Sequence, residues 1–229
     1  MIHIFSSFAN DIITYEHNRV IPGWPALWIS KVMEDLKIKH KFYTGTTGEV
    51  IIAKDGNGED KGIITKVYPI PHLSHIDEKD IIIISTLQQE FSLSEIIRTT
   101  NDIFIDIQGF LRWDFWRKKR FDCRAIQTRG DIFIKATREE FSYLDDHEDV
   151  RHTFIVTNGW DDIELISSEL NKKISIRSEQ FRDTIGAGDT FFSSLCVFYE
   201  KNKDIENAVR LASEYTYVFL SKKNNSYSS

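Results

Sequence analysis

The stretch that most narrows the fold and function of this chain is Asp183-Thr184-Ile185-Gly186-Ala187-Gly188-Asp189-Thr190-Phe191-Phe192. The mainly apolar residues 193–199 follow and are long enough to begin a helix. Small residues at 186–188 let the backbone turn tightly and approach a ligand closely. Their N–H groups would lie at the N-terminus of that helix, where free donors and the helix dipole favour an anion. The pattern therefore indicates a phosphate site.

Asp189 would fall in the first turn of this helix, beside the anion site. A carboxylate there can accept the proton of an attacking hydroxyl, while the loop N–H groups stabilise charge on the phosphoryl oxygens. Phosphoryl transfer depends mainly on positioning and electrostatics, so a glycine-rich loop and one base are sufficient. On these residues alone, a loop that only connects a strand to a helix is an equal alternative.

Short apolar segments recur along the chain and predict β-strands. Several show little polar alternation, as in strands that are covered on both faces. Helical patterns lie between them, at residues 25–37, at residues 93–98 after a Ser92 cap, and in the 3.6-residue stripe after Asp204. This alternation predicts an α/β sandwich around a mostly parallel sheet. The predicted strands are residues 2–5, 51–53, 63–68, 81–85, 103–107, 132–135 and 154–157.

Two segments depart from this alternation. Asp55-Gly56-Asn57-Gly58 separates two of the apolar segments and predicts a hairpin turn. Residues 12–20 predict a short extended segment that ends at the turn Ile21-Pro22-Gly23. We find no repeat and no linker before the polar tail at residues 222–229, so residues 1–229 are predicted to form one domain.

Composition excludes several classes of protein. The 229 residues are 41% hydrophobic and 28% charged, which is enough for one sizeable core. No apolar run is long enough to span a bilayer, and no signal-peptide pattern opens the chain, so a cytoplasmic protein is expected. A net charge of −6 argues against nucleic acid as the main partner. Two cysteines cannot form a disulfide framework.

Asp183 to Asp189 matches the D-T-x-G-A-G-D string of the ribokinase-like (PfkB) carbohydrate kinases, which this chain therefore resembles. Weaker similarities keep the family's order along the chain. Phe154 to Gly159 resembles the strand that ends in V-T-x-G, and residues 131–140 resemble the strand with K-P-N-x-x-E. Asp106-Ile107-Gln108-Gly109-Phe110-Leu111-Arg112 resembles the D-x-Q-x-x-x-R string of polyol-directed branches such as the myo-inositol kinases.

The resemblance implies a three-layer ribokinase-like sandwich and an ATP-dependent transfer to a hydroxyl of a small sugar, polyol or nucleoside, with Mg²⁺ and a monovalent cation such as K⁺. Asp189 would be the catalytic base, with Gly186, Ala187 and Gly188 as the anion hole. The resemblance assigns the remaining roles as follows: Thr157, Gly159, Thr137 and Gly188 bind the nucleotide; Asp11, Gly23, Asp106 and Arg112 bind the substrate; Glu140 acts on Mg²⁺ through water; and Asp183 helps to hold the monovalent cation.

This chain also departs from the family pattern. The G-G-x-x-x-N segment reads Gly23-Trp24-Pro25-Ala26-Leu27-Trp28, so two indoles would fill space near the expected sugar site. Thr137 replaces the Asn of K-P-N-x-x-E, and Asp162 replaces the last Gly of V-T-x-G-x-x-G. Only residues 12–21 are available for the family's β-lid. We therefore expect a very reduced lid, and either a monomer or a dimer that is not built on a lid clasp.

Two other functions compete with the kinase. A non-catalytic member would keep the fold and the anion site as a nucleotide- or metabolite-binding regulator, and the two tryptophans, Thr137 and the short lid favour it. A hydrolase with the same anion hole would need a nucleophile–base pair, which is not recognisable here. The intact Asp183 to Asp189 string favours the kinase, with small-molecule substrates and neither nucleic acid nor membrane as a partner.

Overall fold

The computed structural model describes residues 1–14, 19–23, 25–54, 60–66, 68–70, 76–93, 101–114, 117–148, 150–177, 179–181 and 183–225. Trp24 and most of the helix predicted at residues 93–98 lie outside this range.

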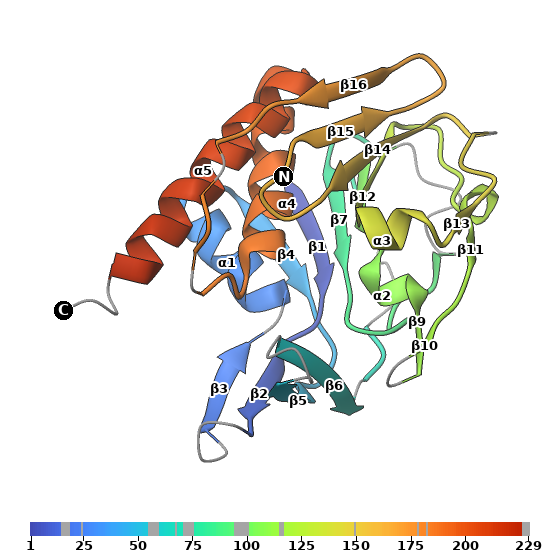
Figure 1. Cartoon of the computed structure of the whole chain (residues 1–229). Helices are drawn as coiled ribbons and strands as arrows, with labels where there is room; N and C mark the ends of the chain where they lie inside the picture. The colour runs from blue at the N-terminus through green and yellow to red at the C-terminus, as the bar shows by residue number, and fades with distance from the viewer. Residues whose placement is uncertain are drawn as a thin grey trace.

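An eight-stranded sheet forms the centre of the molecule (Figure 1), in the order β16-β15-β14-β12-β8-β7-β1-β4. The pairs from β4 to β14 are parallel, and β15 and β16 add an antiparallel edge. The α/β sandwich with a mostly parallel sheet is thus confirmed. The strands are β1 (Ile2–Ser6), β4 (His40–Tyr43), β7 (Ile81–Ser85), β8 (Ile103–Asp106), β12 (Ile132–Thr137), β14 (His152–Thr157), β15 (Ile163–Ile166) and β16 (Asn171–Ile174).

The two faces of this sheet are covered differently. Three long helices pack on one face: α1 (Pro25–Asp35), α4 (Ala187–Asn202) and α5 (Ile205–Asn225). The other face is covered by shorter elements, of which α2 and α3 lie near the ends of β8 and β12 (Figure 1). These are α2 (Gln108–Leu111), β9 (Arg112–Asp114), β10 (Arg117–Lys118), β11 (Phe121–Asp122), the 3-10 turn Cys123–Ala125, α3 (Arg138–Phe141) and β13 (Leu144–Asp145).

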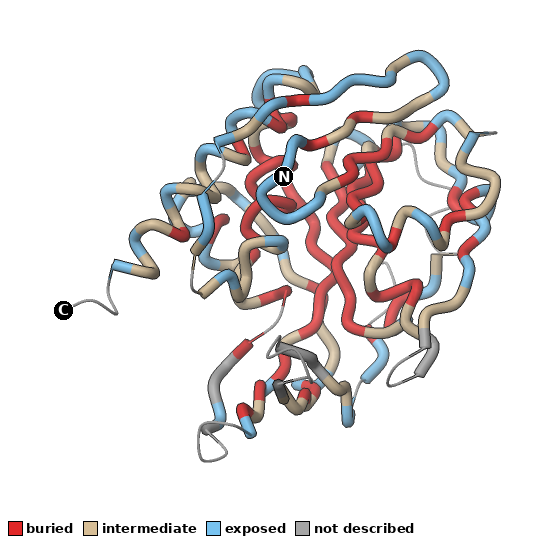
Figure 2. Tube along the Cα trace, in the orientation of Figure 1, coloured by how far each residue is buried: buried red, intermediate tan, exposed pale blue. Residues whose placement is uncertain are grey.

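The central strands are buried on both faces, which explains their nearly continuous apolar sequence. In β7, Ile81 and Ile83 pack toward the long helices, whereas Ile82 and Ile84 pack toward the short elements. Side chains alternate across a strand, so one isoleucine run supplies both cores. Figure 2 shows these strands as the most deeply buried part of the chain.

A second sheet of four strands, in the order β3-β2-β5-β6, lies beyond one end of the main sheet (Figure 1). The flap predicted at residues 12–21 is too small, because β5 and β6 add to it: β5 pairs parallel with β2 and antiparallel with β6. The turn predicted at residues 55–58 lies outside the described residues. Residues 21–23 continue a strand and are not the predicted turn. The size of the lid therefore no longer favours a monomer or a dimer without a lid clasp. The strands are β2 (Ala9–Ile13), β3 (Arg19–Gly23), β5 (Gly48–Lys54) and β6 (Asp60–Lys66).

The parallel strands end together at one edge of the main sheet, where open α/β sheets bind ligands. The segments that follow β1, β7, β8, β12 and β14 all start there. Within the described residues, no helix has the length and apolarity needed to cross a membrane.

Candidate active site

The loop at the start of α4 is shaped by glycine and by a tryptophan from α1. Gly186 caps the helix with φ +82°, a left-handed conformation that glycine adopts without strain. A Cβ at this position would lie 2.4 Å from the indole of Trp28, so the ring packs directly on the loop backbone. The same indole meets Phe219 of α5 edge-on, with 5.6 Å between ring centroids. The indole of Trp28, on α1, thus packs between the backbone of Gly186 and Phe219 of α5.

The backbone amides of this loop have different roles. The N–H of Ala187 donates to Thr184 O at 3.0 Å, so this amide stabilises the turn and is not available to an anion. The prediction that all three amides form the anion hole is corrected at this position. Gly188 and Asp189 lie in the first turn of α4, where helix geometry provides no acceptor for their N–H groups. These amides form the positive end of the helix.

Asp189 is half-buried in the same turn. Burial raises the pKa of its carboxyl to about 7, and the charge of Asp106 adds to this shift. The cations of Lys135 and Arg112 act in the opposite direction. A carboxyl whose pKa lies near neutral pH is well matched to general base catalysis.

Lys135 and Asp106 form a buried ion pair on neighbouring strands. Their Nζ and Oδ2 atoms lie 2.9 Å apart, with 7% and 4% of the two side chains exposed. Burial alone would lower the pKa of Lys135. The negative charges of Asp106 and Glu140 outweigh this effect, so the pKa of Lys135 is raised. A Cβ on Gly188 would lie 3.6 Å from Lys135 Nζ, so this cation is adjacent to the start of α4. Asp106, which is predicted to bind substrate, thus also holds Lys135 in place through its Oδ2 atom.

Arg112 brings a second cation to this edge. Its Nη1 donates to Leu87 O at 3.2 Å. Burial lowers the pKa of the guanidinium, against the charges of Glu140, Asp106 and Asp189. The charge of Arg112 therefore interacts with that of Asp189, the predicted base.

Glu140 and Thr137 form a capping box at the start of α3. The Glu140 carboxylate accepts the N–H of Thr137 at 2.8 Å, and Thr137 Oγ1 accepts the N–H of Glu140 at 3.1 Å. Only 4% of Glu140 is exposed. Thr137 thus keeps the local geometry at the position where the family has Asn, and its hydroxyl is already used as the helix cap.

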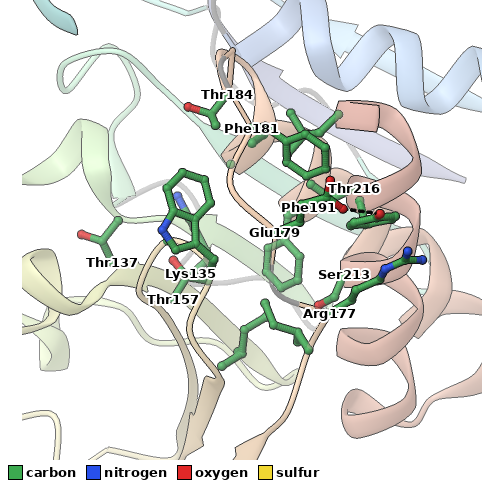
Figure 3. Close-up of a pocket in the computed structure, with 18 residues that line it drawn as sticks. Lys135, Thr137, Thr157, Arg177, Glu179, Phe181, Thr184, Phe191, Ser213 and Thr216 are labelled. Carbon is green, nitrogen blue, oxygen red and sulfur yellow. Dashed lines mark hydrogen bonds between the residues drawn. The ribbon is translucent and has the colours of Figure 1, made fainter. Parts of the chain in front are cut away.

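A cavity of about 340 Å³ opens beside residues 183–188, the loop before and at the start of α4 that we call the anion loop (Figure 3). Lys135, Thr137 and Thr157 line one side, and Ser213 and Thr216 of α5 line the other. The structure also brings Gly159 and Gly188 to this cavity, so all four residues predicted to bind the nucleotide line one space.

The outer part of this cavity is aromatic. The guanidinium carbon of Arg177 lies over the ring of Tyr217, 3.8 Å from the ring centroid. The Tyr217 ring also meets Phe181 edge-on, with 5.5 Å between the ring centroids. The Tyr217 hydroxyl donates to Glu179. Ile176 and Leu220 add apolar surface. The cavity therefore runs from a cationic inner end at Lys135 to an aromatic outer end.

Asp11 and Gly23 meet where β2 pairs with β3. A Cβ on Gly23 would lie 1.9 Å from Asp11 Oδ2, so this carboxylate fits only against a glycine. Asp11 is 4% exposed, and its charge raises the pKa of Asp189, which places the two carboxylates near each other.

Sequence reasoning assigned no role to Lys135, Glu90 or Lys223. Glu90 is buried and accepts Ser7 Oγ at 2.8 Å and the N–H of Leu87 at 2.9 Å, so it holds the segment after β7 against the end of β1. Lys223 forms an ion pair with Asp183, with 2.7 Å between Nζ and Oδ1. Two signals for Lys135 were available: it is a lysine in a mainly apolar, buried strand, and it stands at the Lys of the K-P-N-x-x-E pattern.

No group of three or more His, Cys, Asp or Glu side chains could hold a metal ion in the described part of the chain. Mg²⁺ in phosphoryl-transfer sites is commonly held by one or two carboxylates together with the donor's phosphates and water. Glu140 and Asp189, near the inner end of the cavity, are compatible with that arrangement.

The comparison with protein families gives a match to one part of the chain. Residues 135–229 match the model of the pfkB family carbohydrate kinases. This segment contains Lys135, Thr137, Glu140, Thr157 and the anion loop. No curated protein matches the chain.

Solved structures of ribokinase-family enzymes share the fold. A pyrophosphate-dependent kinase of the ribokinase family, complexed with a pyrophosphate analog and myo-inositol, aligns with TM-score 0.67 and 14% identity over 96% of this chain and 95% of that chain. Fructokinase from Vibrio cholerae O395 aligns with TM-score 0.68 and 15% identity over 96% and 99%. The nucleoside kinase of Methanocaldococcus jannaschii aligns with TM-score 0.66 and 16% identity over 96% and 91%. The resemblance to the ribokinase-like (PfkB) carbohydrate kinases is thus confirmed.

Proposed function

We propose that this chain, with its ribokinase-like fold and its match to the pfkB family, transfers the terminal phosphoryl group of ATP to a hydroxyl of a small sugar, polyol or nucleoside. The observation that carries this proposal is the position of Asp189. Asp189 lies in the first turn of α4, and burial raises the pKa of its carboxyl to about 7. Gly188, the residue before it, lies next to the buried ammonium of Lys135. A regulator that only binds a nucleotide or a metabolite would not need a general base at this position.

The reaction would proceed by in-line transfer. Asp189 accepts the proton of the acceptor hydroxyl, whose oxygen forms a bond to the terminal phosphorus. The bond between that phosphorus and the bridging oxygen breaks, and ADP leaves. The N–H groups of Gly188 and Asp189 stabilise charge on the transferred oxygens. Mg²⁺, when bound with the donor, would neutralise phosphate charge, and Glu140 would hold it through water.

Lys135 supplies the positive charge at the inner end of the donor cavity. Its ammonium lines the cavity and lies adjacent to Gly188, where the terminal phosphate would sit. The ion pair with Asp106 fixes its position, because a buried lysine without a partner would lose its charge. Asp106 therefore acts through Lys135 as a positioning residue.

The size and lining of the donor cavity support a nucleotide. Its outer part is formed by Tyr217, Phe181, Ile176 and Leu220, beyond the phosphate end. Aromatic and apolar walls favour the flat face of a nucleobase. Pyrophosphate, the donor of one structural neighbour, has no apolar part to use this surface.

The acceptor would lie on the other side of Asp189, toward the second sheet. Asp11 is close enough to influence Asp189 and is fixed against Gly23. Its carboxylate would accept hydrogen bonds from hydroxyls of the acceptor. Together with the Asp106 to Arg112 string, this favours a polyol such as an inositol.

The test is ADP release from Mg·ATP with a panel of sugars, inositols and nucleosides, repeated with GTP and pyrophosphate as donors. We expect turnover of one acceptor class that Asp189→Asn reduces by about 10²- to 10⁴-fold. Glu148→Gln makes the same acid-to-amide change on an exposed turn and should behave as the wild type.

The alternative is a regulator that binds nucleotide without turnover. A thermal shift with ATP in the absence of any turnover would establish it and refute the kinase. The structure provides one observation for this alternative, since Thr137 stands in the place of the family's Asn and its hydroxyl is used in the capping box.

A further inference from the structure

The C-terminal end of α5 is bonded to the residues that enter the anion loop. Lys223 Nζ donates to Asp183 Oδ1 at 2.7 Å and to Ile185 O at 2.9 Å. Asn224 Nδ2 donates to Asp183 O at 3.0 Å, and the N–H of Asp183 donates to Asn224 Oδ1 at 2.9 Å. Two consecutive side chains of one helix thus fix the backbone on both sides of Asp183.

These contacts test whether Asp183 can hold the monovalent cation that the family resemblance implies. Such an ion would need the Asp183 carboxylate and nearby carbonyl oxygens such as that of Ile185. Both oxygens already accept hydrogen bonds from the ammonium of Lys223, whose side chain is 18% exposed. A second positive charge at this distance would be repelled. The residues therefore do not fit a monovalent metal ion.

The bond to Ile185 O also determines the direction of a loop amide. In a trans peptide the C=O and the following N–H point in opposite directions. The Ile185–Gly186 peptide is trans, because none of the described peptide bonds is cis. Lys223 binds the carbonyl of this peptide, so the N–H of Gly186 is directed away from Lys223. The lysine would hold that donor in one orientation.

We infer that the Lys223 ammonium is a built-in cation of the anion loop, which replaces a dissociable monovalent ion and orients the Gly186 amide. Lys223 is a positioning residue, because it acts through the loop backbone. The inference rests on the proposed kinase function only for its activity readout, since ion dependence of stability is measurable without a substrate.

The first test compares the wild type in KCl, NaCl and choline chloride at equal ionic strength. We expect the same Tm and the same turnover in all three salts, because the cation is part of the chain. A Tm or a turnover that rises specifically with K⁺ would overturn the inference. If no acceptor is phosphorylated, the proposed function fails, while the Tm series still decides the role of Lys223.

The second test uses Lys223→Met, with Lys222→Met as the matched control on the adjacent, exposed position. We expect Lys223→Met to lower turnover by about tenfold to a hundredfold, as misplaced catalytic groups do. K⁺ or NH₄⁺ should restore part of this loss and should raise the Tm of this variant alone. Absence of any rescue by both ions would refute the replacement. If Lys223→Met does not fold, the wild-type salt series decides.

Discussion

Lys135 Nζ and Asp106 Oδ2 lie 2.9 Å apart on adjacent parallel strands, at the edge of the sheet where the anion loop begins. The pair connects the fold to the chemistry. Asp106 is the last residue of β8, and Lys135 projects its charge to the inner end of the donor cavity. We therefore expect these two side chains to contribute to both stability and the proposed activity, and the two contributions can be separated.

Lys135→Met should destabilise the protein by about 3–5 kcal/mol, because Asp106 is left buried without its cation. The double variant Lys135→Met/Asp106→Asn should recover most of this loss and remain inactive. Urea unfolding and turnover together check the prediction. Equal stability of the single and double variants would contradict it.

Asp189→Asn should increase stability at pH 8 while it reduces turnover by about 10²- to 10⁴-fold. The folded-state pKa of Asp189 is about 7, above the ordinary value of 3.8. Between these values the folded state retains a proton that the unfolded state has lost, so this group's contribution to stability falls as the pH rises. Asn has no proton to lose. Its Tm advantage over the wild type should be smallest near pH 4 and largest above pH 7, and a pH-independent difference would refute the shift.

The kcat/KM of the wild type should rise with pH and level off above an apparent pKa of about 7. The base must be unprotonated to accept a proton, and kcat/KM reports the free enzyme. The measurement is initial rate at limiting acceptor from pH 5.5 to 9. A profile that is already flat at pH 5.5 would show that Asp189 has an ordinary pKa.

Gly186→Ala and Gly159→Ala should have different costs, although both glycines have positive φ. At Gly159 a Cβ meets nothing within 4 Å, so only the backbone strain is added, about 1–2 kcal/mol. At Gly186 the Cβ also lies 2.4 Å from the Trp28 indole. Gly186→Ala should therefore show the larger drop in Tm.

The comparison at position 186 has its own control. In the double variant Gly186→Ala/Trp28→Ala the clash is removed but the strain remains. The Tm difference between the double variant and Trp28→Ala should be smaller than the Tm difference between Gly186→Ala and the wild type. Additive effects would show that the loop and the indole are not in contact.

Local sequence patterns predicted the central strands well, because these strands are apolar on both faces. Of the strands of the main sheet that they missed, β4 and β16 lie at its two edges, and β15 pairs between β14 and β16. Three of the four residues of β16 are exposed, and its sequence, Asn171-Lys172-Lys173-Ile174, carries no apolar pattern. In β4, only Tyr43 is buried. Edge strands are often charged, and their pairing is decided by the neighbouring strand.

The second sheet shows the same limit over a longer distance. The hairpin around residues 55–58 was predicted from its turn, but its partner was not. β5 pairs with β2 across two intervening strands and a helix, and no local pattern encodes such a parallel pair.

The sequence by itself determined the α/β class, the glycine loop at the start of α4 and the position of Asp189, because these depend on residues that are adjacent in the chain. Only the tertiary structure brought Lys135 to Asp106, Trp28 to Gly186 and Lys223 to Asp183. These pairs join segments 29 to 158 positions apart. Burial then raised the pKa of Asp189, since desolvation and the charges of distant side chains act only once the chain has folded.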